Sequence, residues 1–399
     1  MNTPQNVIPV LLGGDLNAYS VALSFKARYN INSHVFARYR CGATENSRFI
    51  TTHLCSGIAD FNVALPELLY FASKNPDSKL ILIPCSDSYI PLIYTIKDAI
   101  SELYDFILPK EEHYKMLTDK AEFQKTLEKH KIGTPKTVII SKGEDYREAL
   151  RGARYPAVIK PSSSEKYYKH IFTGMKKVYF PESEGEGLEI IERIFASGYE
   201  GKILLQEKIS SKATNYVLTT LSDRKGEVIR ASLGKVILEE RGDSSYGNYS
   251  AIITEPLDMM CLSIIKKLNK LAYVGIANFD IMRLGNDFYC LELNARQGRS
   301  CDYLRAGGIS LAEYFLENAL FENSIKCDFS YREALWHYPK FRTVMNNIET
   351  EGEIERAYRL YREGKSYSPF ENGYEGLAKR LYKIVHDIRL EKSFRGVRE

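Results

Sequence analysis

The chain has 399 residues, of which 44% are hydrophobic and 27% charged, and its net charge is +4. This length exceeds one typical hydrophobic core and predicts two to three domains. Lys and Arg alternate with Asp and Glu, which argues against a nucleic-acid partner, and no apolar run approaches the ~20 residues of a membrane-spanning helix.

The seven cysteines are scattered, odd in number and without CxxC spacing, which argues against a disulfide framework or a zinc site. The N-terminal sequence MNTPQNVIPVLLGGD has no basic n-region and resembles a first strand more than a signal peptide. We therefore expect a cytoplasmic protein with no membrane span.

Alternating strands and helices over residues 7 to about 110 predict a doubly wound parallel sheet. The expected strands are 7–12, 34–37, 80–84 and 106–108, and the expected helices are 19–29, 66–74 and 94–104. Pro66 is expected at a first helical position. Ligands of such sheets bind beyond the carboxyl ends of the strands.

Two short motifs follow strands of this sheet, Gly13-Gly14-Asp15 and Ser86-Asp87-Ser88. The first lacks the third glycine of a dinucleotide fingerprint, so a tight turn is the favoured interpretation. Contact between this loop and a substrate group stays open.

The pattern changes from residue 114. It predicts helices at 119–131, capped by Thr118, and at 144–153 and 188–197, with strands at 137–140, 157–160 and 202–206. The loop after Lys160, PSSSEKYYKHIFTGMKKVYF, is rich in serine and lysine (Lys166, Lys169, Lys176, Lys177). Such a loop could close over phosphate groups, or it is an exposed polar connection.

Beyond residue 210 the pattern predicts strands at 216–221, 228–233 and 235–238, a polar loop at 239–249, and helices at 259–271 and 311–320. The tail ends in a basic helical segment, 374–392. Its apolar residues predict a core-facing stripe more than a membrane face: Leu377, Leu381, Ile384, Val385, Ile388 and Leu390.

The stretch IANFDIMRLGNDFYCLELNAR, 276–296, predicts a hairpin with a turn at Gly285-Asn286-Asp287. Asp280 and Glu292 would lie opposite each other, and Glu292, Asn294 and Arg296 would share one side of their strand. Two carboxylates and an amide suit Mg²⁺, and a guanidinium beside them would neutralise a phosphoryl group. The alternative is a solvated hairpin face with a surface ion pair.

Several markers occur in one order along the chain: Asp119-Lys120, Lys160, Gln206-Glu207-Lys208-Ile209, and then Asp280, Glu292, Asn294 and Arg296. This ordered set resembles the ATP-grasp superfamily of carboxylate–amine ligases over residues 5–325. Length and the basic helical tail are most similar to the D-aspartate ligase group. The resemblance implies an α/β fold with a doubly wound N-terminal domain (1–113), two ATP-clasping lobes (114–205 and 206–325) and a helical C-terminal extension (326–399).

The resemblance also implies roles for individual residues. Lys120 and Lys160 would contact the ATP phosphates, Glu207 would accept from the adenine amino group, and Gln206, Lys208 and Ile209 would complete the adenine hinge. Asp280, Glu292 and Asn294 would bind Mg²⁺, with Mn²⁺ as a substitute, and Arg296 would act with Lys160 in catalysis. Asn215 stands where the family has an acidic residue, and the family's glycine-rich lid is serine-rich here.

The implied reaction joins a small acidic amino acid, aspartate, to an amine of a peptidoglycan precursor and produces ADP. An acyl-phosphate route needs stabilised phosphoryl charge more than a nucleophilic side chain. Residues 161–177 and 239–249 are the candidate lids, and Arg241, Arg299 and Arg305 could clamp a second carboxylate or form structural salt bridges. Ligation of another peptide or natural product, a non-catalytic nucleotide-binding role, and a homodimer all stay open.

Overall fold

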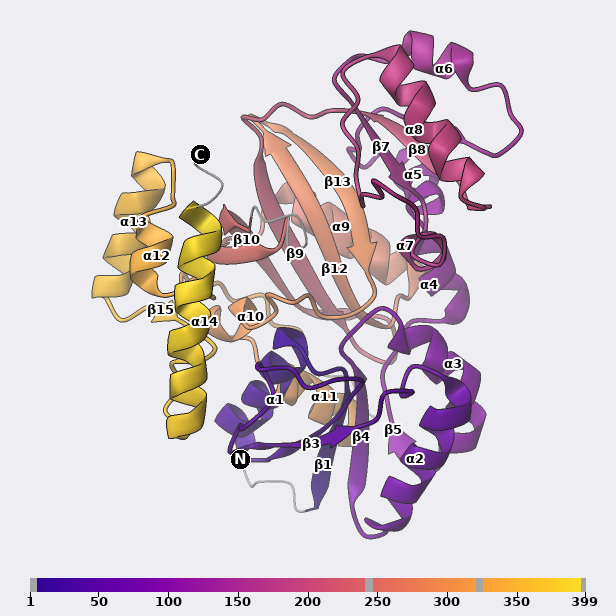
Figure 1. The fold of residues 1–399 in the computed structure, drawn as a ribbon. Coiled ribbons are helices and arrows are strands. Elements are labelled where there is room, and N and C mark those ends of the chain that lie inside the picture. Colours follow the sequence, from indigo (N-terminus) through magenta and orange to yellow (C-terminus); the bar gives the residue numbers. More distant parts are fainter. Residues whose placement is uncertain (1–5, 241–246, 321–325, 396–399) are drawn as a thin grey trace. The chain divides into compact units, whose positions relative to one another are not determined.

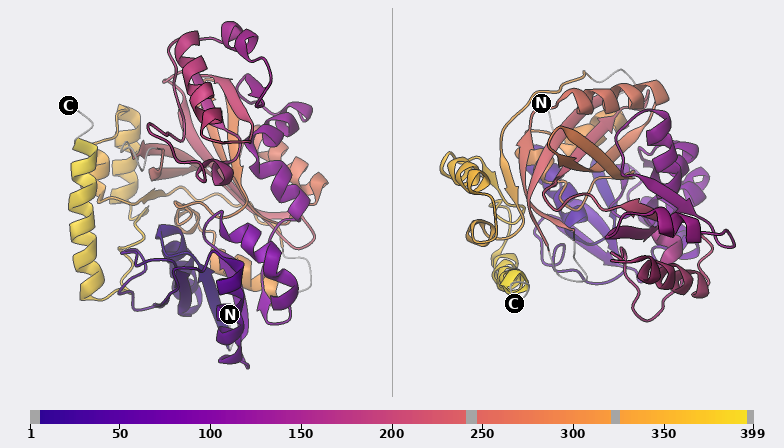
Figure 2. Two further views of the ribbon diagram at one scale, coloured as in Figure 1. Left: turned by 45° about the vertical axis from the view of Figure 1, so that its right-hand side comes forward. Right: turned by 90° about the horizontal axis from the view of Figure 1, so that it is seen from above.

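The computed structural model describes residues 6–240, 247–320 and 326–395 (Figure 1, Figure 2). The chain forms two compact units. Unit 1 comprises Met1–Pro109, Val217–Asn278 and Ala295–Glu399, and unit 2 comprises Lys110–Tyr216 and Phe279–Asn294. The four-part division expected from the sequence stays a prediction.

The N-terminal part of unit 1 is a parallel sheet with strand order β3-β2-β1-β4-β5, as the alternation of strands and helices predicted. The strands are β1 (Val7–Leu12), β2 (Ser33–Ala37), β3 (Ile50–Leu54), β4 (Lys79–Pro84) and β5 (Tyr104–Asp105). The chain order reverses between β1 and β4, which is the switch point where ligands of such sheets bind. Strand β3 was not predicted.

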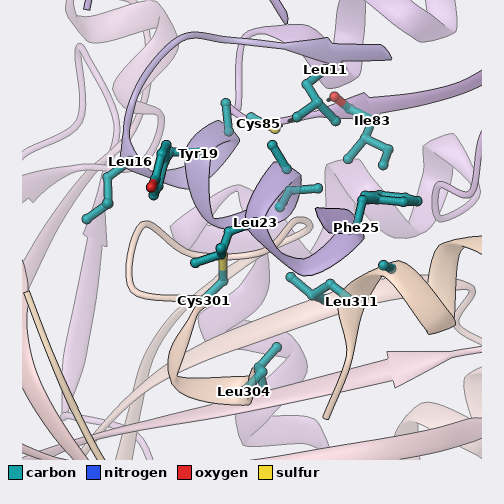
Figure 3. Close-up of a cluster of buried hydrophobic side chains, with 14 of the residues drawn as sticks. Leu11, Leu16, Tyr19, Leu23, Phe25, Ile83, Cys85, Cys301, Leu304 and Leu311 are labelled. Atoms are coloured by element: carbon teal, nitrogen blue, oxygen red, sulfur yellow. Dashed lines mark hydrogen bonds between the residues drawn. The ribbon is translucent and has the colours of Figure 1, made fainter. Parts of the chain in front are cut away.

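Side chains of β1 and β4 point alternately to two faces, and each face has its own core. Leu11 and Ile83 pack with α1 (Leu16–Tyr29) and α11 (Leu311–Leu320). Figure 3 shows this cluster, in which Leu23 and Phe25 of α1 lie near Leu311. On the other face, neighbouring residues of both strands pack with α2 (Phe61–Ser73) and α3 (Tyr89–Ile100).

Polar caps set where these helices begin. Asp60 accepts a hydrogen bond from the Asn62 N–H, so α2 begins at Phe61 and Pro66 lies inside the helix. The expectation that Pro66 starts the helix was therefore wrong. Asp15 likewise caps α1 by accepting from the Asn17 and Ala18 N–H groups.

A second sheet has the strand order β13-β12-β9-β10-β11-β14-β15. Its strands are β9 (Thr214–Ser222), β10 (Val228–Glu239), β11 (Tyr249–Glu255), β12 (Gly275–Leu284), β13 (Asp287–Asn294), β14 (Leu335–His337) and β15 (Ser366–Tyr367). Strand β10 is continuous where two strands were predicted, and β11 was not predicted. Helix α9 (Met259–Leu271) has the predicted bounds.

The hairpin predicted around residue 286 is present. Strand β12 ends at Leu284 and β13 begins at Asp287, so Gly285 and Asn286 form the connection and Asp287 belongs to the strand. Gly285 has a φ of 61°, which glycine adopts without a steric cost. The chain passes between the two units within β9 and β12.

The C-terminal part of unit 1 is mainly helical, with α10 (Tyr303–Ala306), α12 (Phe341–Met345), α13 (Glu351–Arg362) and α14 (Leu377–Arg395). The apolar stripe of α14 was predicted to face the core, and this was wrong. Leu390 is buried, whereas five other members of the stripe are exposed: Leu377, Leu381, Ile384, Val385 and Ile388.

Unit 2 contains an antiparallel sheet with the order β6-β8-β7, formed by β6 (Thr137–Ile140), β7 (Ala157–Pro161) and β8 (Ile203–Glu207). Its helices are α4 (Glu111–Thr118), α5 (Lys120–Lys129), α6 (Arg147–Gly152), α7 (Ser164–Tyr167) and α8 (Glu184–Ala196). Asp119, not Thr118 as expected, caps α5, because the Thr118 hydroxyl donates to the Tyr114 carbonyl at the end of α4.

Within the described residues of both units, no helix combines the length and the apolar character needed to span a bilayer.

Candidate active site

A largely shielded ion pair joins two of the predicted site residues in unit 2. The Lys120 Nζ lies 3.0 Å from Glu292 Oε2, and 12% and 22% of the two side chains are exposed. The charge of Lys120 holds the pKa of the Glu292 carboxyl well below its usual range, and Lys177 and Lys160 act in the same direction. Glu292 is therefore ionised at neutral pH.

Lys160 lies near the end of β7 and is buried. Burial, together with the neighbouring positive charge of Lys120, lowers the pKa of its ammonium to about 8. Glu292 and Asp280 act in the opposite direction on the same ammonium. Both predicted carboxylates therefore lie within electrostatic range of Lys160.

Contacts along the hairpin attach Glu292 to the rest of unit 2. The Cys290 N–H donates to the Gly133 carbonyl at 2.9 Å, and the rings of Phe123 and Phe279 lie 6.3 Å apart. A Cβ on Gly133 would come within 2.1 Å of the Phe288 carbonyl oxygen, so only glycine permits this approach. The hairpin is thereby held against α5, the helix that begins with Lys120.

The donor set of Asp280, Glu292 and Asn294 fits a hard divalent cation. It offers oxygen atoms from two carboxylates and one amide, and Mg²⁺ binds through one or two carboxylates while substrate phosphates and water complete its shell. The described residues contain no group of three or more His, Cys, Asp or Glu side chains placed to hold a metal.

The predicted adenine hinge begins within the last two residues of β8 and continues beyond the strand. The buried Gln206 donates to the Thr137 hydroxyl at 2.7 Å, and Glu207 accepts from the Lys136 N–H at 2.9 Å. The Lys208 ammonium lies 5.3 Å from the ring centre of Phe180, and Ile209 is half-buried. Asn215 is the second residue of β9. A nucleotide role for these residues stays a prediction.

Lys177 was named in the lysine-rich loop but not among the site residues. Its charge lowers the pKa of both Glu292 and Lys160, so it acts on the same cluster, although its own side chain is exposed. The loop folds back through the Tyr167 hydroxyl, which bonds the Tyr179 hydroxyl at 2.7 Å and donates to the Lys176 carbonyl at 3.1 Å. Four lysines lay in that stretch, and the sequence did not distinguish the one that reaches the cluster.

Arg296 does not share a strand face with Glu292 and Asn294, so this expectation was wrong. Strand β13 ends at Asn294, and Arg296 belongs to unit 1. Its guanidinium lies 2.6 Å from Asp87 Oδ2, and the next residue, Gln297, donates to the Pro84 carbonyl at the end of β4.

Arg296 thereby reaches the switch point of the parallel sheet in unit 1. Gly13-Gly14-Asp15 follows β1 and Ser86-Asp87-Ser88 follows the adjacent β4, so both motifs lie at the predicted edge. Arg296 and Arg299 act electrostatically on Asp15. Two arginines and two carboxylates thus gather within unit 1.

The other arginines considered as substrate clamps have protein partners. Arg299 donates to Glu240 at 2.7 Å and lies over the Tyr338 ring. Arg305 binds the buried Asp302 through two hydrogen bonds of 2.7 and 2.9 Å, which is the geometry of a structural salt bridge. Arg241, and residues 241–246 of the second candidate lid, lie outside the described residues.

Comparison with known proteins identifies relatives of this chain. No protein-family model matches the chain. Over 354 residues the chain is 30% identical to the D-aspartate ligase of Enterococcus faecium (strain Aus0004), and the match covers 84% of each protein.

Solved structures show the same fold. The ADP complex of an N5-carboxyaminoimidazole ribonucleotide synthetase matches with a TM-score of 0.61 and 15% identity, over 90% of this chain and 86% of that chain. The L-amino acid ligase from Bacillus licheniformis matches with a TM-score of 0.54 and 16% identity, over 80% and 75% of the two chains. The biotin carboxylase domain of Hydrogenobacter thermophilus 2-oxoglutarate carboxylase, in complex with MgADP, ADP and bicarbonate, gives 0.61 at 14% identity, over 82% and 73%.

The structural matches show the fold, and the 30% identity over most of both proteins shows that the chain and the D-aspartate ligase are related. The chain therefore belongs to the ATP-grasp superfamily of ATP-dependent carboxylate–amine ligases, within the D-aspartate ligase group.

Proposed function

We propose that this ligase uses ATP and Mg²⁺ to activate a carboxylate of aspartate, or of a similarly small acidic amino acid, and joins it to an amine on a peptidoglycan-precursor side chain. The relative named D-aspartate ligase supports the choice of acid. The acceptor is proposed from the resemblance to that group.

The chemistry requires activation because a carboxylate is a poor electrophile and oxide is a poor leaving group. Transfer of the γ-phosphoryl group of ATP to the carboxylate oxygen forms an acyl-phosphate and releases ADP. The amine then attacks the carbonyl carbon, phosphate leaves, and the amine loses a proton. Most of the work is positioning of the phosphates and stabilisation of their charge.

The cationic cluster of unit 2 is suited to this task. Lys120, Lys160 and Lys177 outnumber the carboxylates of Asp280 and Glu292, so the cluster carries excess positive charge. We propose that Lys120 shifts from Glu292 to a phosphate oxygen when ATP binds, and that Lys160 contacts the same phosphate chain. A buried ammonium stabilises a phosphate oxygen strongly because little water screens it.

Asp280, Glu292 and Asn294 are the residues proposed to hold Mg²⁺. A bound Mg²⁺ would neutralise charge on the phosphate oxygens and orient them. Because Lys120 keeps Glu292 ionised, that carboxylate is available as a ligand at neutral pH.

Gln206, Glu207, Lys208, Ile209 and Asn215 are proposed to contact the nucleoside. Glu207 accepts a backbone hydrogen bond from Lys136, and a carboxylate has room for further donors such as the adenine amino group. Arg296 is proposed to stabilise the transferring phosphoryl group, a role that suits its planar set of donors.

The observation that carries the proposal is the Lys120–Glu292 ion pair beside the buried Lys160. The test is release of ADP with a panel of amino acids and amines. We expect ADP release that requires aspartate, or a similarly small acidic amino acid, together with an amine acceptor. Equal ADP release with neutral amino acids would contradict the proposed acid.

The proposed compartment is the cytoplasm, supported by seven cysteines that are all free thiols. A homodimer stays an open alternative.

A further inference from the structure

The C-terminal helix α14 is the long yellow helix in Figure 1, and most of its large apolar side chains are exposed. The exposed fractions are 76% for Leu377, 63% for Leu381, 48% for Ile384, 50% for Val385 and 49% for Ile388. These residues recur at intervals of three and four, so they form one stripe along the helix. We call these five residues the outer stripe.

The inward side of α14 is polar and firmly bonded. The buried Lys379 ammonium donates to the backbone carbonyls of Gly42 at 2.7 Å, of Glu45 at 3.0 Å and of Ala43. It also lies 4.9 Å from the ring centre of Tyr19. One lysine thus binds the helix to the loop that follows β2.

The next turns continue this polar contact. The buried Asp387 pairs with Lys383 of the same helix at 2.9 Å and lies 3.7 Å from Lys340. His386 shares a 2.7 Å hydrogen bond with the Tyr338 hydroxyl. Leu390 and Phe394 complete the buried side. Turning the helix to bury the outer stripe would remove the carbonyl partners of Lys379 and the Tyr338 partner of His386. A buried charge that loses its partners is strongly unfavourable. The fold therefore specifies that the stripe faces outward.

Basic residues border the outer stripe. At 100° per residue, the exposed Arg380 and Arg389 lie on opposite sides of the stripe. The exposed Lys392 lies one turn beyond Ile388, at the C-terminal end of the stripe. The helix has only two acidic residues, the buried Asp387 and the half-buried Glu391. We call Arg380, Arg389 and Lys392 the basic rim.

Pairing of two copies through this stripe fits poorly. From Leu377 to Ile388 the stripe is about 17 Å long and one helix wide. The area that such a stripe can bury is far below the roughly 800 Å² per partner in stable protein interfaces.

We propose that the outer stripe and basic rim dock this ligase on a lipid bilayer that contains anionic headgroups. The helix lies parallel to the surface, with the stripe in the boundary between headgroups and acyl chains and the rim beside the lipid phosphates. Helices with an apolar stripe and flanking Lys or Arg bind membranes in this way without spanning them. Attraction to an anionic surface adds to the burial of the stripe.

The test is co-sedimentation of the full-length protein with vesicles of phosphatidylcholine alone or with about one third phosphatidylglycerol. We expect binding to the mixed vesicles that weakens in high salt. Arg380→Gln, Arg389→Gln and Lys392→Gln together should lower the partition coefficient roughly a hundredfold. Leu381→Gln with Ile384→Gln should lower it by a similar or larger factor.

Leu262→Gln is the matched control, because this residue is 44% exposed on α9 and lies outside the stripe. It should bind vesicles like the unchanged protein. All variants replace exposed side chains, so their melting temperatures should stay within about 2 °C.

Two results would overturn the proposal. One is vesicle binding that is equal for both lipid compositions and indifferent to the stripe and rim variants. The other is no vesicle binding, together with a dimer in analytical ultracentrifugation that Leu381→Gln with Ile384→Gln dissociates, which would make a second copy of the chain the occupant.

Discussion

The charged clusters of the two units differ in how they are held. In unit 2, the side chains of Lys120, Lys160 and Glu292 are largely shielded from water. Their charges shift the pKa values of Lys160 and Glu292. In unit 1, Arg296 pairs with Asp87, whose side chain is 58% exposed. A buried cluster keeps its charges in place, whereas an exposed ion pair exchanges partners at little cost. We therefore expect unit 2 to govern the binding of nucleotide and metal, on which turnover also depends, and Arg296 to act mainly on kcat.

The largest effect is expected from Glu292→Gln. It removes a proposed magnesium ligand and the partner of Lys120, and we expect amino-acid-dependent ADP release to fall on the order of 10³-fold. Glu122→Gln is the matched control, because Glu122 pairs with Lys125 and Lys202 at the surface of the same unit. Undiminished turnover in Glu292→Gln would contradict the metal assignment.

Arg296→Ala tests the other side of the comparison. We expect kcat to fall about 10²-fold with the KM for ATP nearly unchanged, because the lost interaction would be made mainly in the transition state. Asp87→Asn removes only the exposed partner of Arg296 and should change kcat about twofold or less. A large rise in the KM for ATP in Arg296→Ala would show that the two clusters do not divide the work in this way.

The low pKa of Lys160 predicts a pH dependence. Above about pH 8 the ammonium loses its proton, so kcat/KM for ATP should fall up to tenfold per pH unit. Lys160→Arg keeps its charge and should move the decline to higher pH. An identical pH profile in this variant would assign the decline to another group.

The same shift has a consequence for stability. Between pH 8 and the ordinary lysine pKa of 10.5, the unfolded chain binds more protons at this position than the folded protein does. The contribution of Lys160 to the free energy of unfolding therefore rises with pH across that window. Comparison of the unchanged protein with Lys160→Met at pH 8 and pH 10 measures it.

Gly133→Ala is expected to act mainly on stability. A methyl group there would collide with the Phe288 carbonyl oxygen, and we expect a loss of about 2 kcal/mol in the free energy of unfolding. Nucleotide affinity should also weaken, because β13 carries Glu292. Gly152→Ala meets no atom within 4 Å and should leave both quantities nearly unchanged.

Sequence patterns predicted the helices and strands better than they predicted which residues contact one another. Strand β1 and helices α9 and α11 have the predicted bounds, because each combines a clear hydrophobic pattern with polar or glycine boundaries. Strand β3, ITTHL, was not predicted, since it has little apolar character and two half-buried residues besides its buried Ile50.

The apolar stripe of α14 was predicted correctly from its periodicity, but its direction was not. Its periodicity indicated a helix and an apolar face, and both are present. The predicted direction of that face was wrong, because Lys379 donates to backbone carbonyls of the loop after β2 and Asp387 lies 3.7 Å from Lys340, and a single helix does not reveal these contacts with remote segments.

The sequence by itself determined the order of the charged markers, the hairpin at Gly285 and the α/β character, because these depend on local spacing and on turn chemistry. Only the tertiary structure decided that Lys177 joins Lys120, Lys160 and Glu292, that Arg296 turns toward Asp87, and that α14 faces outward. Those outcomes depend on electrostatic and packing contacts between residues far apart in the chain, which no local pattern contains.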